Sequence, residues 1–229
     1  VKYIMTNFLF TTKGFIKKLN EDQIGIRIFG DKTRICICDG HWGMEAAQIA
    51  KAACLKAKSF PDNKSTAIEL VEKIQKEIFD KFGRSKMDPE KDFTPETSLL
   101  AVEIDSKNQL TILSYGDCRL MVSRKEKIVF QLKTIKTWLG AFSFLGLRNR
   151  LSVNKAIIFK RITCKTNDLV WLFTDGIDEC VYEKPTISFI WLAKTGSNHS
   201  NVKMIIKKVV EEVKRFGAED NASIAIIKC

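Results

Sequence analysis

Residues 35–43, with the sequence ICICDGHWG, place an aspartate directly behind a short apolar run. Four apolar or thiol side chains in a row, too few for a helix, are typical of a strand that is buried on both faces. Asp39 and Gly40 follow this run, and both residue types favour a change of chain direction. We therefore expect a buried strand that ends with a carboxylate at its tip.

Similar pairings of a carboxylate with an apolar run recur along the chain. Asp117 and Asp175 each follow such a run, whereas Asp22 and Asp220 each stand just before one. If these strand ends met at one rim of a sandwich, the carboxylates would repel one another by kcal/mol amounts unless a cation lay between them. Hard oxygen ligands suit Mg²⁺ or Mn²⁺ that retain several waters. Taken singly, each aspartate is more often only a turn residue, and spacing alone does not show that the five converge.

The wider pattern predicts many strands and few helices. Short alternating or apolar runs predict strands at 24–29, 34–38, 98–104, 110–115, 119–123, 128–132, 156–162, 169–173 and 223–227. Helical periodicity predicts helices at 44–58, 66–82 and 202–216. Thr66 and Glu69 are spaced as a capping box for the second helix, and Gly217 is placed as the stop of the third. A turn signal at 105–108 and irregular composition at 133–154 complete the pattern, which favours an α+β sandwich with helices covering antiparallel sheets.

The composition is that of a folded globular chain. With 229 residues, 45% hydrophobic and 28% charged, we expect one domain spanning 1–229 that folds without a disulfide or structural metal. No apolar run reaches the roughly 18 residues that cross a bilayer, and the first residues lack the features of a secretory signal. The seven cysteines include no Cys-x-x-Cys pair and stand mostly in apolar surroundings. They indicate buried, reduced thiols and a cytoplasmic location.

The charge balance is strongly basic. Thirty-eight basic and 27 acidic residues give a net charge of +11, which can attract an anionic partner. The basic residues are scattered, however, without a run of five or more and without interleaved aromatic side chains. This distribution favours a solvated basic surface over a nucleic-acid interface, and we expect no nucleic-acid partner and a monomer.

Five short motifs give the sequence a family resemblance. In chain order they are NED at 20–22, DGHWG at 39–43, GDCR at 116–119, TDG at 174–176 and DN at 220–221. Their order and their positions at expected strand ends resemble the motifs of the metal-dependent protein phosphatases, the type 2C serine/threonine phosphatases. The resemblance runs from about residue 13 to residue 227. It implies a four-layer αββα sandwich, two antiparallel sheets flanked by helices, with a binuclear Mg²⁺ or Mn²⁺ site at one end. It also implies hydrolysis of phosphoserine and phosphothreonine in protein substrates.

The resemblance assigns the first metal ligands. Asp39 would bridge two ions, and Gly40 would offer its backbone carbonyl to one of them. Asp175 and Asp220 would bind an ion that Asp39 shares. A water held between two cations loses a proton near neutral pH and can attack phosphorus, while the cations neutralise charge on the phosphoryl group.

Other matching residues would complete the site. Asp22, with Glu21 beside it, would act on the second ion directly or through water, and Asp117 matches the position of a third, weaker ion. His41 falls where some members have a proposed general acid, which would protonate the leaving oxygen. The alternative for this histidine is that it only starts the following helix. Lys17 stands where the family usually has an arginine that binds the substrate phosphate, so the charge is kept and the bidentate fork is lost.

Several further positions depart from the family pattern. Trp42 replaces a usual glycine and would narrow the mouth of the site. Glu96 begins a segment that is usually Gly-Ser/Thr-Thr, and Cys118 replaces a usual serine. Between Arg119 and Asp175 the chain is short and lacks a usual Asp-His pair, which implies a reduced flap beside the substrate.

The leading hypothesis is an active Mg²⁺- or Mn²⁺-dependent protein phosphatase. A catalytically impaired relative that serves as a regulatory binding module is the main alternative. A basic nucleic-acid-binding protein, and a metal-dependent phosphodiesterase or small-molecule phosphatase, are further alternatives. The presence of all four core acids, Asp22, Asp39, Asp175 and Asp220, favours the active enzyme.

Overall fold

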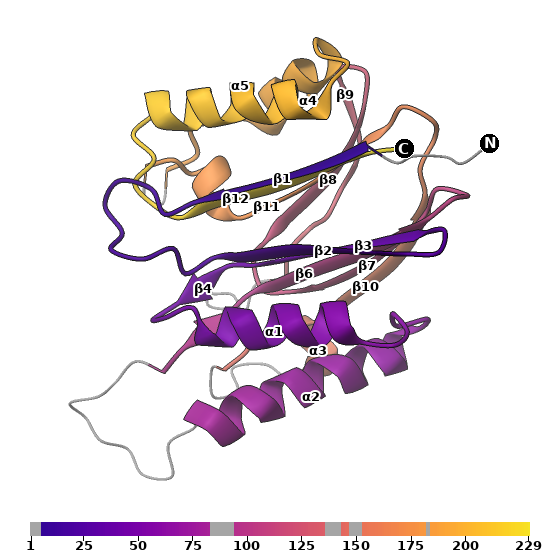
Figure 1. Cartoon of the computed structure of the whole chain (residues 1–229), viewed down its shortest axis with the longest axis vertical. Coiled ribbons are helices and arrows are strands. Elements are labelled where there is room, and N and C mark those ends of the chain that lie inside the picture. The colour runs from indigo at the N-terminus through magenta and orange to yellow at the C-terminus, as the bar shows by residue number, and fades with distance from the viewer. Residues whose placement is uncertain (1–5, 83–93, 136–142, 147–152, 182–183) are drawn as a thin grey trace.

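Two antiparallel sheets pack face to face, with helices on both outer sides (Figure 1). The structure is a computed structural model that describes residues 6–82, 94–135, 143–146, 153–181 and 184–229. The first sheet contains β1 (Thr6–Thr12), β12 (Ala222–Lys228), β11 (Leu169–Phe173), β8 (Arg119–Arg124) and β9 (Lys127–Gln131), in that spatial order. The second contains β10 (Ile158–Thr163), β7 (Gln109–Tyr115), β6 (Leu99–Asp105), β3 (Lys32–Cys38) and β2 (Gln23–Phe29). The αββα sandwich expected from the sequence is confirmed.

Short strands and the helices complete the layers. The strands β4 (Gly40–His41) and β5 (Glu96–Thr97) pair with each other at one end of the second sheet. The helices α1 (Glu45–Lys56), α2 (Lys64–Phe82) and α3 (Val153–Ala156) lie on the second sheet's side of the molecule, whereas α4 (Phe189–Ser197) and α5 (Val202–Arg215) lie on the first sheet's side (Figure 1). A single 3₁₀ turn, η1 (Asp175–Ile177), follows β11. No helix in the described part of the chain has the length and apolar character to cross a bilayer.

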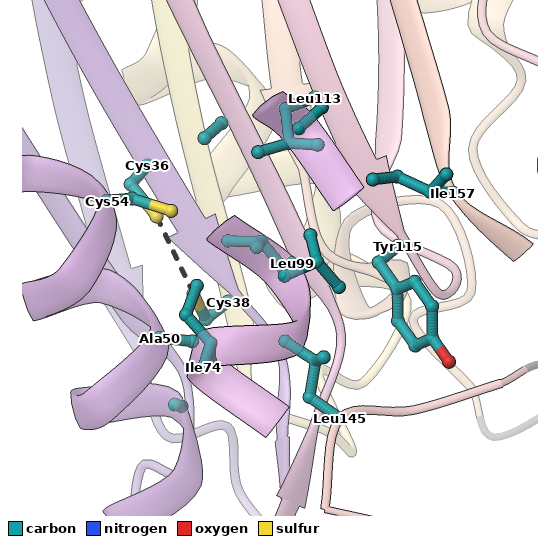
Figure 2. Packing of buried hydrophobic residues seen from close by; sticks show 14 of the residues in the cluster. Cys36, Cys38, Ala50, Cys54, Ile74, Leu99, Leu113, Tyr115, Leu145 and Ile157 are labelled. Carbon is teal, nitrogen blue, oxygen red and sulfur yellow. Dashed lines mark hydrogen bonds between the residues drawn. The ribbon is translucent and has the colours of Figure 1, made fainter. Parts of the chain in front are cut away.

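Alternating side chains of β3 serve two separate cores. Ile35 and Ile37 pack between the two sheets, whereas Cys36 and Cys38 face α1 and α2. Figure 2 shows this second core, in which the Cys36 and Cys38 sulfurs lie 3.6 Å apart near Cys54. A third core lies between the first sheet and α4 and α5. All seven cysteines are free thiols and six are buried, as expected from their apolar surroundings.

The predicted start of the second helix is wrong. The helix begins at Lys64, so Thr66 lies within its first turn and is not the cap. Asn63 caps the helix instead, because its Oδ1 accepts a 3.0 Å hydrogen bond from the backbone N–H of Thr66. Gly217 does stop the third helix, with a φ of 117°. Most of the stretch predicted to be irregular, 133–154, lies outside the described residues.

Two elements of seven or more residues had no counterpart among the predicted ones. The strand β1 pairs with β12 at the edge of the first sheet. The helix α4 is capped by Ser188, whose side chain accepts a hydrogen bond from the N–H of Trp191. The loop that joins β1 to β2 lies beside β4 at one end of the sandwich, at the left in Figure 1. The predicted site residues belong to this end.

Candidate metal centre

Two aspartates stand at the same end of the β2–β3 hairpin. Gln23, the first residue of β2, is paired with Cys38, the last residue of β3. Asp22 and Asp39 each lie one residue beyond this pair, so the antiparallel register brings them side by side. Asp22 is 2% exposed and Asp39 is 6% exposed.

Three further aspartates come from neighbouring strand ends. Asp117 follows β7, Asp175 opens η1 behind β11, and Asp220 precedes β12. Burial raises the pKa of the Asp39 carboxyl well above its ordinary value, and the charges of Asp175, Asp22, Asp117 and Asp220 raise it further. Burial, together with neighbouring carboxylates, also raises the pKa values of Asp22 and Asp117 to about 7. The five acids therefore lie in one shared field of negative charge.

Several of the carboxylate oxygens have no protein partner. Asp22 Oδ1, Asp39 Oδ2 and Asp117 Oδ1 are buried and accept no hydrogen bond. A buried acceptor without a partner costs about 1–3 kcal/mol, and more when it is charged, so a cation would offset both this cost and the mutual repulsion. Within the described ranges, no three His, Cys, Asp or Glu side chains are placed to enclose an ion by themselves. The oxygens therefore fit a hard divalent cation that retains waters, rather than a closed cage of side chains.

A buried hydroxyl ties Asp22 to the other sheet. Thr174 Oγ1 donates a 2.9 Å hydrogen bond to Asp22 Oδ2 and accepts a 3.0 Å bond from the backbone N–H of Ser223. Thr174 and Ser223 belong to the first sheet's end, whereas Asp22 belongs to the second sheet. The two sheets are thus joined at the rim where the acids lie. No role was predicted for this hydroxyl, and the one feature of the sequence that indicates it is its place directly before Asp175.

The loop between β1 and β2 brings a lysine to the acids. Lys17 Nζ lies 3.1 Å from Asp220 Oδ1 and 3.7 Å from Glu21 Oε2. Burial tends to lower the pKa of Lys17, but the attraction of Asp220, and then of Glu21 and Asp39, outweighs burial and raises it. Glu21 Oε1 also accepts a 2.6 Å hydrogen bond from the N–H of Gly43, which joins this loop to the segment after Asp39. Contact between Lys17 and a substrate phosphate stays a prediction.

The backbone around Gly40 is held tightly. A Cβ at Gly40 would lie 2.4 Å from the carbonyl oxygen of Glu21, so a larger residue would push the two loops apart. On the other side, Thr97 Oγ1 donates a 2.7 Å hydrogen bond to the carbonyl of Asp39, and the N–H of Ser98 donates one of 2.9 Å. The peptide units that follow β3 are therefore fixed next to the acids.

His41 lies in a strand, so its interpretation as a helix-start residue is wrong. It belongs to β4, and α1 begins only at Glu45. Its Nε2 is 3.6 Å from Asp39 Oδ1, and its Nδ1 is 3.8 Å from Glu96 Oε1. The ring packs edge-on against Phe144, with 4.6 Å between centroids. Burial lowers the pKa of His41, which opposes the raising effect of Asp175 and other nearby acids.

An ion-pair cluster beside Asp117 was not predicted. Arg119 Nε lies 3.1 Å from Asp178 Oδ1, and its Nη2 lies 2.6 Å from Glu179 Oε1. Its Nη1 donates a 2.8 Å hydrogen bond to the carbonyl of Asp117. Burial raises the pKa of Asp178 to about 7, although Arg119 lowers it in part. The sequence feature that could have indicated this cluster is the pair of acids three and four residues after Asp175.

Comparison with known proteins supports the fold. No family model and no curated protein sequence matches the chain. The serine/threonine phosphatase of S. agalactiae superposes with a TM-score of 0.76 at 15% identity, covering 98% of this chain and 99% of that one. The catalytic domain of the serine/threonine phosphatase PstP, solved with two manganese ions, has a TM-score of 0.74 at 16% identity, covering 98% and 97%. PppA of Pseudomonas aeruginosa has a TM-score of 0.70 at 16% identity, with the same coverages.

These likenesses define the class of fold. The chain has the fold of the type 2C serine/threonine phosphatases, as the motif resemblance implied. The likeness spans the described elements of both sheets and at least 98% of the chain in each of the three comparisons.

Proposed function

We propose that this chain is a Mg²⁺- or Mn²⁺-dependent phosphatase that hydrolyses phosphoserine and phosphothreonine in proteins. We further propose that residues 1–229 act as one catalytic domain, as a monomer in the cytoplasm. The observation that supports the activity most is the group of buried aspartates whose oxygens lack protein partners, at one end of a phosphatase fold. Two divalent cations, when bound, supply an activated water and neutralise charge on the phosphoryl group.

The residues that would hold these ions share a common rim. They would be Asp39, Asp175 and Asp220 for one ion, Asp22 and Glu21 for the second, the carbonyl of Gly40 for one of these two ions, and Asp117 for a third. Asp22 fits this role through its unpartnered Oδ1, because Oδ2 is bonded to Thr174. Glu21 is more restricted, because Gly43 occupies one of its oxygens and Lys17 lies near the other.

Two residues would act on the substrate itself. Lys17 would bind the phosphate as a point charge from the edge of the acids. His41 would hold a proton at Nε2, the nitrogen that faces Asp39, and would donate it to the leaving serine or threonine oxygen.

The direct experiment measures phosphate release from a phosphothreonine peptide with Mn²⁺, and again after EDTA. Release that depends on Mn²⁺ and is lost in Asp39→Asn supports the proposal.

One observation favours a second candidate, the impaired binding module. Lys17 pairs with Asp220, and this ammonium would compete with a cation for the same carboxylate. Binding of the peptide without any hydrolysis at saturating Mn²⁺ would select this candidate.

A further inference from the structure

The loop that carries Lys17 also exposes large apolar side chains. Phe15 is 70% exposed, Ile16 is 69% exposed and Leu19 is 58% exposed. Single exposed apolar residues are common on protein surfaces, but three within five residues form a patch of the kind that marks an interaction site. We call these three residues the apolar loop patch.

An apolar cavity of about 200 Å³ opens beside this patch. It lies between the β1–β2 loop, β1, η1 and α5, and its lining includes Phe10, Phe15, Ile177, Val210, Val213 and Lys214. Phe15 is thus both a wall of the cavity and the most exposed member of the patch. A cavity of this size accommodates one aliphatic side chain.

The cavity lies close to the candidate metal centre. Its lining includes Ile177, two residues after Asp175, together with Ala218 and Ala222, which stand two residues before and after Asp220. Two residues of extended chain span at most about 7 Å. The backbone positions of these lining residues therefore lie within about 7 Å of those of Asp175 and Asp220, a distance that one or two residues of an extended peptide also span.

The loop is also fixed in place and positively charged. The N–H of Phe15 donates a 2.8 Å hydrogen bond to the carbonyl of Ala218, so the patch is anchored next to Asp220. Lys13 and Lys17 lie on the same loop, and Lys214 lines the cavity. These cations complement a phosphate group that is flanked by an apolar side chain. A phosphopeptide is therefore the occupant that fits both the charge and the apolar surface.

We propose that this surface selects phosphopeptides with a large apolar residue one or two positions from the phosphorylated residue. The apolar residue occupies the cavity beside Phe15 while the phosphate lies near Lys17. This inference rests on the proposed function for its catalytic readout, but peptide binding tests it independently of turnover.

The test uses phosphothreonine peptides that differ only at the two positions on each side, with Leu, Ala or Lys. Fluorescence anisotropy gives their affinities, and phosphate release with Mn²⁺ gives kcat/KM. We expect the Leu peptides to exceed the Ala peptides by about tenfold or more in affinity, in keeping with burial of one aliphatic side chain. Phe15→Ala should bring the ratio of the affinities for Leu and Ala peptides close to one. Ile190→Ala, a similarly exposed residue on α4 at 59%, should leave the ratio unchanged.

The outcomes separate this inference from the proposed function. Mn²⁺-dependent hydrolysis of p-nitrophenyl phosphate with equal affinity for Leu and Ala peptides would overturn the inference and leave the phosphatase in place. If no peptide were hydrolysed but Leu peptides were still preferred in a Phe15-dependent way, the proposed phosphatase activity would be overturned. The peptide-binding surface would then be supported as part of a binding module. Phe15-dependent binding to anionic lipid vesicles, with no peptide preference, would show that the patch meets a membrane and would also overturn the inference.

Discussion

The side chain of Asn221 holds Glu21, a residue 200 positions earlier in the chain, through a 2.8 Å hydrogen bond from the Glu21 N–H to Asn221 Oδ1. The Nδ2 group of the same side chain donates to the carbonyls of Lys13 and Leu19, at 2.8 and 3.0 Å. One amide therefore closes the loop that carries Lys17 and the apolar loop patch. The position of that loop relative to the acids depends on Asn221.

Asn221→Ala should loosen this loop. Three backbone groups would lose their partner, and we expect the free energy of unfolding to fall by about 1–3 kcal/mol. We also expect KM for a phosphopeptide to rise several-fold, because Lys17 would be less well placed. The matched control is Asn201→Ala, which removes the cap at the N-terminus of α5 and should cost about 1 kcal/mol without changing KM. Equal effects of the two variants on KM would contradict this role.

Asp39→Asn should abolish metal-dependent hydrolysis while the fold persists. The substitution keeps the side-chain size and removes one charge from the cluster, so repulsion among the acids falls. In EDTA, Tm should therefore stay equal or rise, whereas the Mn²⁺-dependent rate should fall to background. Asp80→Asn, on the exposed face of α2, is the control and should keep the full rate. A near-normal rate for Asp39→Asn would remove the binuclear mechanism.

The metal-free protein should lose stability as the pH rises. In the folded chain the pKa values of Asp22 and Asp117 are about 7, against about 3.9 in the unfolded chain. Between these values the folded state binds more protons at Asp22 and Asp117, so the contribution of these two groups to the free energy of unfolding is fully present below about pH 4 and is lost as the pH rises to about 7. Mn²⁺ should raise Tm more at pH 8 than at pH 5.5, because it binds the deprotonated acids.

A variant separates this effect from the titration of the rest of the protein. Asp22→Asn cannot titrate, so its Tm in EDTA should fall less between pH 5.5 and pH 8 than that of the unmodified chain. Asp80→Asn, which is remote from the centre, should keep the original slope. If all three proteins showed the same slope, the buried acids would not be the source of the pH dependence.

Lys17 should act on substrate binding. Lys17→Ala removes the point charge, and we expect KM for a phosphothreonine peptide to rise by about tenfold or more, which is typical of one lost charged contact. Lys17→Arg should lower KM, since a guanidinium can bind phosphate with two parallel hydrogen bonds. Lys18→Ala, next to it on the same loop, serves as the control and should change KM little. Unchanged KM values in both Lys17 variants would show that Lys17 pairs with Asp220 and does not contact the substrate.

Much of the fold could be predicted because its signals are local. The strand that ends at Asp39 shows an apolar run followed by turn residues, and the structure ends β3 at that point. The helix α4 was not predicted, and it contains Gly196, a residue type that disfavours a helix on local grounds. In the structure, a Cβ at Gly196 would lie 2.6 Å from the ring of Trp171, so close packing on the sheet accounts for the glycine. The strand β1 depends on pairing with β12, more than 200 residues away, which no local pattern reveals.

The candidate site likewise contains features that short sequence motifs predict and features that only the folded structure shows. The aspartates at strand ends and the glycine at 40 could be found from short motifs. The links that position them, such as Thr174 to Asp22, join residues about 150 positions apart and have no spacing that a sequence pattern could show. The pairing of Lys17 with Asp220 joins residues about 200 positions apart. Sequence therefore predicts the candidate ligands, and contacts between distant segments of the fold position them.

The position of His41 next to Asp39 fits a proton donor. Its Nε2 faces the Asp39 carboxylate at 3.6 Å, whereas Nδ1 faces Glu96 at 3.8 Å. Burial lowers its pKa, so the protonated form needed for acid catalysis is lost as the pH rises through a value below the ordinary 6.5. We therefore expect kcat for a phosphopeptide to decline as the pH rises through that pKa.

His41→Ala should distinguish acid catalysis from a structural role. The alkoxide of serine or threonine leaves poorly without a proton, so a phosphopeptide should be hydrolysed about 10²–10⁴-fold more slowly. A nitrophenolate leaves readily as an anion, so the loss with p-nitrophenyl phosphate should be much smaller, and the pH dependence of kcat for the peptide should flatten. His199→Ala, in the loop between α4 and α5, is the control and should keep both rates. Equal losses on both substrates would instead show that His41 positions Asp39, and unchanged rates on both would exclude any part in the reaction.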